Sequence, residues 1–168
     1  MVFGVNMNKH GAKKWAHFDE YWGLGWPELT WLEPYFLGPP ERRWFSDTGN
    51  DSAGLSLQGI EGTSHLELGL GRVDIELMLW GNPNLGVLLI YSKSGGHNGE
   101  DYSSKGDITR IREWVRSTHG DPLPIGLFIP FEKAWLAVKE FIKTEGELPT
   151  SIEWIANRDL PPNTFPDP

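Results

Sequence analysis

Hydrophobic and polar positions between residues 130 and 146 repeat with the period of an α-helix. Apolar side chains recur three or four residues apart and form one stripe, while charged side chains occupy the other faces. Pro130 suits the start of a helix, where its missing N–H costs nothing, and Gly146 suits a left-handed stop. The pattern therefore predicts an amphipathic helix over 131–145. Its stripe consists of Phe131, Ala134, Trp135, Val138, Phe141 and Ile142.

Several other stretches follow the pattern of β-strands. Apolar residues alternate with polar or small ones in 55–57, 66–70 and 73–79, which is typical of antiparallel strands with one covered face. Residues 87–91 are apolar at every position and predict a central strand covered on both faces. Two short strands are also expected near the C-terminal end, at 125–129 and at 152–156 after the turn that Pro149 introduces.

Two regions leave alternatives open. Residues 108–117 fit a strand with Ile111 and Val115 on one face, or a helix. Residues 15–44 contain five of the nine Trp residues, and many Gly and Pro residues interrupt them, so a helix fits only 27–37, where Pro34 would kink or split it. These aromatic side chains either cap one end of the core or form an anchor surface for a partner.

Taken together, the predicted elements describe an α+β fold. We expect one domain over 1–168, with an antiparallel sheet of about five to seven strands. The helix at 131–145 should pack on one face through Trp135, Val138 and Phe141, and a final strand should follow it. Residues 1–17 are expected to form a loose arm or an edge strand, and 159–168 contain too many prolines for regular structure.

Composition excludes several kinds of chemistry. The chain has no Cys, so it has no disulfide, thiolate metal site or Cys nucleophile, which fits a reducing compartment. Its five His residues show no metal-ligand spacing, and no phosphate-binding loop or G-x-S-x-G elbow is present, so we predict no cofactor, metal or catalytic residue. Polar residues interrupt the N-terminal stretch and no long apolar run occurs, so a cytoplasmic location is expected.

The negative charge is concentrated in one part of the chain. Residues 18–71 contain nine acidic and two basic residues, a net charge of −7, whereas the whole chain carries −8. Such a field repels nucleic acid and membrane phosphates and speeds encounter with a basic partner. The alternative is an ordinary solvated surface. Within this segment, Asp47 and Asp51 are candidates for partner contact.

The polar stretch 94–104, SGGHNGEDYSS, is the best local candidate for a functional surface. Its glycines allow close approach, Glu100 and Asp101 supply charge, and Tyr102 supplies an aromatic anchor. The alternative is an ordinary flexible hairpin. The sequence therefore predicts partner binding by Glu100, Asp101 and Tyr102.

The C-terminal half also resembles a known family. An A-x-x-F helix, a Thr and Gly break, a Pro and a strand with Trp resemble the Imm-one family of immunity proteins from bacterial polymorphic-toxin systems. The run GVLLIYSKSGG resembles its middle strand, and the likeness covers about 73–155. The matching positions are Ala137, Phe141, Thr144, Gly146, Pro149 and Trp154.

This resemblance implies a non-enzymatic inhibitor that forms a one-to-one complex with a cognate toxin domain. Toxins beside the family are often nucleic-acid deaminases, whose substrate channel should be basic, so an acidic chain could occlude it. The partner is then a protein, rather than nucleic acid, membrane or a small molecule. Two other classes stay open: a different protein-binding module, and a small hydrolase or transferase with an unrecognised carboxylate site.

Overall fold

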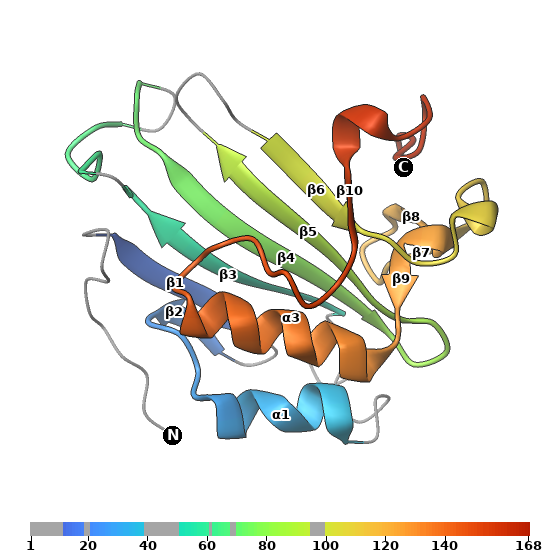
Figure 1. The fold of residues 1–168 in the computed structure, drawn as a ribbon, viewed down its shortest axis with the longest axis horizontal. Coiled ribbons are helices and arrows are strands. Elements are labelled where there is room, and N and C mark those ends of the chain that lie inside the picture. Colours follow the sequence, from blue (N-terminus) through green and yellow to red (C-terminus); the bar gives the residue numbers. More distant parts are fainter. Residues whose placement is uncertain (1–11, 19–20, 39–50, 61, 68–69, 95–99) are drawn as a thin grey trace.

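The computed structural model describes residues 12–18, 21–38, 51–60, 62–67, 70–94 and 100–168. Within them the chain forms one large antiparallel sheet, a separate two-stranded hairpin and two α-helices (Figure 1). The predicted α+β class, with a C-terminal helix followed by a final strand, is confirmed.

The large sheet has eight strands in the order β10-β6-β5-β4-β3-β1-β2, with β9 also paired to β5. The count exceeds the predicted range because β2 and β6 fall in stretches where the sequence analysis expected no strand. The strand bounds are β1 Lys13–Phe18, β2 Tyr21–Leu24, β3 Ser52–Gln58, β4 Asp74–Asn82, β5 Gly86–Ser94, β6 Glu100–Ser104, β9 Phe128–Ile129 and β10 Trp154–Ala156. Because β1 lies between β2 and β3, it is an interior strand, and the rest of the expected N-terminal arm, residues 1–11, lies outside the described residues.

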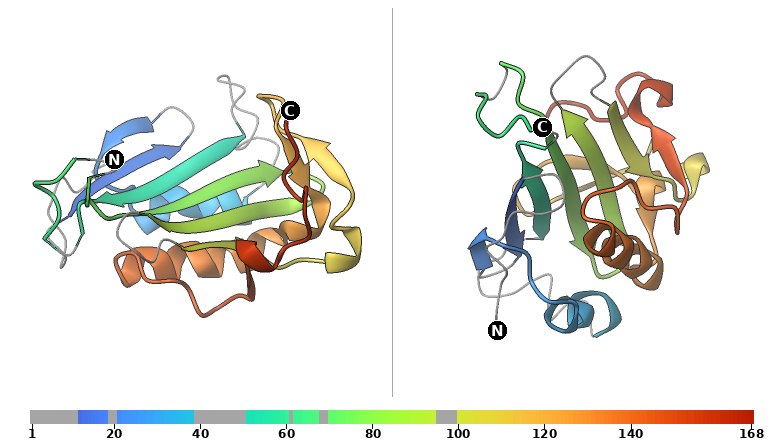
Figure 2. Two further views of the ribbon diagram at one scale, coloured as in Figure 1. Left: turned by 90° about the horizontal axis from the view of Figure 1, so that it is seen from above. Right: turned by 60° about the vertical axis from the view of Figure 1, so that its left-hand side comes forward.

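Helices α1 (Leu29–Leu37) and α3 (Phe131–Lys143) lie side by side (Figures 1 and 2). Their buried side chains share one cluster with the residues of β3 and β4 that point to the same face of the sheet. The rings of Phe36 in α1 and Trp135 in α3 stack with centroids 5.3 Å apart. Pro34 lies inside α1 without splitting it. The main core therefore lies between one sheet face and the two helices.

A second, smaller core lies on the opposite face at one end of the sheet. Leu88 of β5 packs there with Ile111, Leu123, Leu127 and Phe128, while its neighbours Val87 and Leu89 point into the main core. The expectation that 87–91 is a strand covered on both faces is correct for this end of β5. The elements around this core are η1 (Ile108–Arg110), β7 (Trp114–Arg116), β8 (Pro122–Pro124) and η2 (Ile125–Leu127).

Some predicted elements are different in the structure. The strand expected at 66–70 is not formed: its described residues lie in turns, and Leu66 N–H donates to the Thr63 carbonyl at 2.9 Å. Residues 108–117 form a 3₁₀ turn and then a short strand, so each alternative is correct for part of the stretch. Residues 125–129 likewise divide into η2 and β9. After η3 (Asn157–Asp159), the proline-rich tail has no further strand or helix.

Gly146 is needed for the stop after α3. Its φ of 102° is left-handed, its N–H donates to the Phe141 carbonyl at 2.9 Å, and an added Cβ would lie 2.4 Å from Leu57 Cδ1. We expect Gly146→Ala to lower the free energy of unfolding by about 2–4 kcal/mol, since backbone strain and a clash with the core add. Gly62→Ala is the control, because Gly62 has a φ of 74° but open space around its Cα, and it should cost about 1 kcal/mol. Urea denaturation that shows equal losses in both variants would contradict the packing of Gly146 on Leu57.

Candidate functional site

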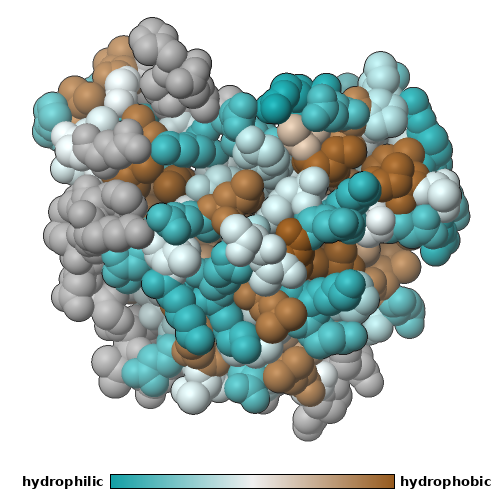
Figure 3. All heavy atoms as spheres, viewed as in Figure 1, coloured by the Kyte–Doolittle hydropathy of each residue, from teal (hydrophilic) through white to brown (hydrophobic). Residues whose placement is uncertain are grey.

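The sheet face opposite the helices is open over β1, β2, β3 and β4. No α-helix of the described chain lies on it, and Figure 2 shows α3 on the other side of the sheet. The helix side, seen in Figure 3, has hydrophobic groups scattered among hydrophilic ones. The strand register aligns one row of side chains across the open face. This row is Leu24, Trp15, Ser56, Glu76, Ser92 and Asp101.

Large apolar side chains collect on the open face at the edge strand β2. Trp22 is 81% exposed and Leu24 is 40% exposed. Trp15 of β1 and Met78 of β4 are half-buried on the same face. An indole of this size left in water is unusual in a monomer and is typical of a surface that a partner covers.

A hollow of about 330 Å³ lies beside these side chains. It exists because the middle of β3 presents two small residues on this face, Gly54 and Ser56, between larger residues of β1 and β4. The imidazole of His17 lies over Gly54, where an added Cβ would come within 2.7 Å of its Nε2. The lining residues are Trp15, Ala16, His17, Trp22, Gly54, Ser56, Gln58 and Glu76.

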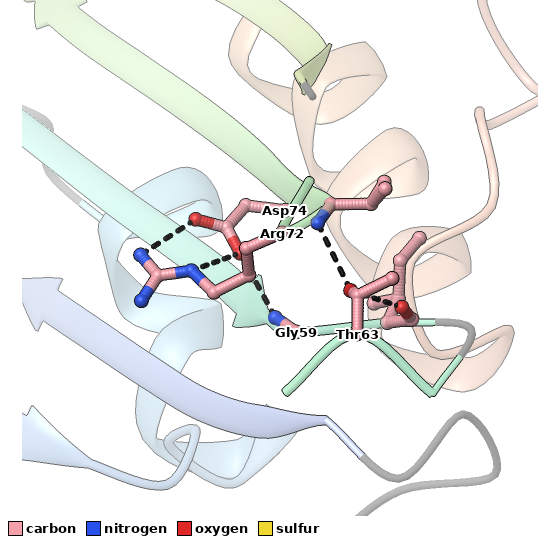
Figure 4. Close-up of polar contacts among 6 residues, drawn as sticks. Gly59, Thr63, Arg72 and Asp74 are labelled. Carbon is pink, nitrogen blue, oxygen red and sulfur yellow. Dashed lines mark hydrogen bonds and ion pairs between the residues drawn. The ribbon is translucent and has the colours of Figure 1, made fainter. Parts of the chain in front are cut away.

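Two carboxylates on β4 face this side of the sheet, and they differ in their partners. Asp74 accepts hydrogen bonds from Arg72 at 3.1 and 3.2 Å and from Gly59 N–H at 2.8 Å (Figure 4). The same loop is tied by Thr63, whose hydroxyl accepts Val73 N–H at 3.0 Å (Figure 4). The positive charge of Arg72 therefore already compensates Asp74.

Glu76, by contrast, has neither a hydrogen bond nor an ion pair with any residue the structure describes. It is half-buried, and burial, with the nearby charge of Asp74, raises the pKa of its carboxyl. Burial also lowers the pKa of His17, which favours its neutral imidazole. The hollow thus contains an acidic group with no built-in counter-ion.

The three residues predicted from 94–104 lie on β6, a strand rather than a loop. Strand alternation separates them: Asp101 pairs with Ser92 and lies on the open face, while Glu100 and Tyr102 lie on the helix side. Arg158 approaches Glu100 at 3.0 Å, and the Tyr102 hydroxyl donates to the Glu100 carboxylate. This hydrogen bond is the main cause that raises the pKa of Tyr102. Of the three, Asp101 alone shares a face with Trp22 and Glu76.

Of the other two predicted residues, the structure describes only Asp51, and Asp51 does not join this surface. Asp51 is 6% exposed, and it accepts hydrogen bonds from the Thr118 hydroxyl at 2.6 Å and from Thr118 N–H at 3.1 Å. It ties the start of β3 to the turn between β7 and β8, so its role in the structure is internal. Asp47 lies outside the described residues.

Sequence patterns did not single out Trp22 among the aromatic residues of 15–44, and they did not identify Glu76. Trp15 and His17 lie two residues apart, as do Trp22 and Leu24, and this spacing is typical of two paired strands. The glycines around them interrupt the alternating pattern, so it does not stand out in the sequence. In the sequence, Glu76 cannot be told from any other polar residue on the solvent side of a strand that has one covered face. Its lack of a partner depends on β1 and β3 and is visible only in the folded chain.

A cluster of metal ligands and a helix that could cross a membrane are both absent from the described part of the chain. No group of three or more His, Asp or Glu side chains there could hold a metal ion. No helix among these residues has the length and apolar character needed to cross a bilayer. The open face, with the exposed Trp22 and the carboxylate of Glu76, is the strongest candidate for function.

Comparison with protein families decides the class. The model of the family described as Immunity protein Imm1 matches residues 38–156, which is most of the chain. The chain belongs to the Imm1 immunity protein family. The likeness predicted over 73–155 is confirmed and extends further toward the N-terminus. No curated protein and no solved structure matches the chain.

The Imm1 match covers only part of the open face. It includes β3, β4 and β6, and hence Glu76 and Asp101. It begins after β1 and β2, which supply Trp15 and Trp22. The exposed aromatic edge is thus built from residues outside the matched region of this Imm1 chain.

Proposed function

We propose that this Imm1 protein protects the cell that produces it by binding a cognate toxin domain in a one-to-one complex. The open sheet face is the contact surface, and binding covers the entrance to the toxin's active site without chemical turnover. The observation that carries this proposal is the 81% exposed Trp22, which lines the same hollow as the unpaired Glu76, in a member of an immunity-protein family.

The proposed toxin acts on nucleic acid and is of the deaminase type. Such an enzyme needs a basic channel for its substrate, and an acidic protein complements that channel. The net charge of −8 supports this assignment and disfavours nucleic acid or an anionic membrane as the partner of the chain itself. The proposed place of action is the cytoplasm, with no small-molecule substrate.

The two carboxylates of β6, Asp101 on the open face and Glu100 on the other side of the same strand, should steer the encounter, since long-range steering does not require direct contact. We expect the double change Glu100→Lys and Asp101→Lys to slow association by about tenfold at low salt and to weaken its salt dependence, with a smaller effect on dissociation. The control reverses two other exposed acids, Glu132→Lys on α3 and Glu153→Lys just before β10. Stopped-flow association at several salt concentrations measures both variants.

A different outcome would place these charges inside the interface. If they are buried and paired in the complex, dissociation accelerates and affinity falls by about 2–5 kcal/mol instead. If the wild type and both double variants have equal association and dissociation rates, β6 is not part of the contact surface.

Co-expression with the toxin gene beside it tests the function itself. Cells that carry both genes should grow, and the two proteins should co-purify. A chain that neither binds nor protects, or that protects only by consuming the toxin's product, would refute inhibition by occlusion.

A further inference from the structure

We infer that the hollow between β1 and β4 on the open sheet face is a receptor for one basic side chain, Arg or Lys, of the partner. The inference rests on the proposed function only for the identity of the protein that supplies this side chain. The chemistry of the receptor itself follows from Trp15, Trp22 and Glu76.

The walls of the hollow suit a cation. Trp15 and Trp22 line it, and an indole face attracts an ammonium or guanidinium group within about 6 Å of the ring, more strongly when water is excluded. Ser56 and Gly54 leave space between the strands, and 330 Å³ is on the scale of small binding pockets. A long, flexible basic side chain can therefore enter with its apolar stem against the indoles.

The charge of the hollow has the matching sign. Glu76 is the one ionisable acid among the lining residues, and none of these residues is Lys or Arg. Other charged groups on the same face are Asp74, which Arg72 compensates, Lys13, which is exposed one row away, and the acid Asp101, which lies in the row of Glu76. An incoming cation would thus supply the counter-charge that Glu76 lacks.

A purely structural role explains Glu76 poorly. A half-buried carboxylate without a partner costs free energy in the folded chain, and a glutamine of the same shape would avoid that cost. Because the pKa of Glu76 is raised, its ionisation destabilises the fold as pH rises through that pKa. The free protein should therefore be no less stable, and at pH 7 more stable, with glutamine at this position.

Glu76→Gln separates binding from folding. With the toxin domain encoded beside the chain, we expect affinity to fall by at least about tenfold, mainly through faster dissociation. The melting temperature of the free variant at pH 7 should equal or exceed that of the wild type. The control Glu132→Gln removes the same charge on the exposed side of α3 and should keep affinity within about twofold. An affinity of Glu76→Gln within twofold of the wild type would overturn the inference.

A second measurement does not need the toxin. N-acetyl-arginine amide is titrated into the free chain while NMR follows the indole N–H signals of Trp15 and Trp22. We expect a saturable shift in the wild type, a loss of at least about tenfold in affinity in Glu76→Gln, and no shift with N-acetyl-glutamine amide. A shift that is absent, or that is the same in Glu76→Gln, would contradict a cation receptor.

The two measurements distinguish the two claims. Toxin binding that is independent of Glu76 refutes the receptor and leaves the inhibitory function standing. A Glu76-dependent response to the arginine amide, with no binding of the adjacent toxin, supports the receptor and refutes the proposed partner.

Discussion

Replacing Phe141 by alanine should lower the free energy of unfolding by about 3–5 kcal/mol. Phe141 is fully buried, and its ring centroid lies 5.2 Å from that of Trp26 and 6.1 Å from that of Tyr91. Truncation removes apolar contact with both rings and leaves a cavity between α3 and the sheet. Trp135→Ala should cost a similar amount, since Trp135 is 4% exposed and stacks on Phe36.

Leu136→Ala on the same helix is the matched control. Leu136 is 46% exposed, so its loss should cost less than about 1 kcal/mol. Chemical denaturation of the three variants gives the comparison. Losses below about 0.5 kcal/mol in both Phe141→Ala and Trp135→Ala would contradict the packing of α3 on the sheet.

Trp22→Ala should weaken toxin binding by about 2–4 kcal/mol, the range of interface hot spots. Trp22 is 81% exposed in the free chain, so the same change should alter the free energy of unfolding by less than about 0.5 kcal/mol. A large loss of affinity without a loss of stability is the signature of a binding residue rather than a core residue.

Leu136→Ala again serves as the control, because it removes an exposed apolar side chain on the helix side. Calorimetry with the adjacent toxin domain measures affinity, and urea denaturation measures stability. If Trp22→Ala binds as tightly as the wild type, β2 lies outside the interface and the contact must be sought elsewhere on the chain.

The sequence predicts the structure best where one hydrophobic pattern repeats several times along a long element. The stripe of α3 predicts its buried side chains, because a helix of 13 residues repeats its pattern several times. Short elements lack such repetition, so β9 and the 3₁₀ turns at Ile108 and Ile125 could not be separated from their surroundings. The stretch around Leu66 shows the opposite error. Its alternating leucines have the pattern of a strand, but Leu66 lies in a turn.

The candidate site depends on relations between strands, which explains what sequence reasoning missed. Glu100, Asp101 and Tyr102 are adjacent in sequence, yet strand alternation places Asp101 on the face opposite its neighbours. As an acidic residue, Asp51 is expected on the surface, but in the structure it is buried against Thr118. Glu76 becomes distinctive only because Arg72 pairs with Asp74 and not with it.

Titration of the purified chain into an activity assay of the adjacent toxin domain tests whether the chain inhibits the toxin by one-to-one binding. We expect that activity falls linearly and ends at one equivalent of chain. Trp22→Ala and Glu76→Gln should shift this curve to higher concentration, whereas Leu136→Ala should not. Full toxin activity at a large excess of wild-type chain, or inhibition complete far below one equivalent, would contradict inhibition by one-to-one binding.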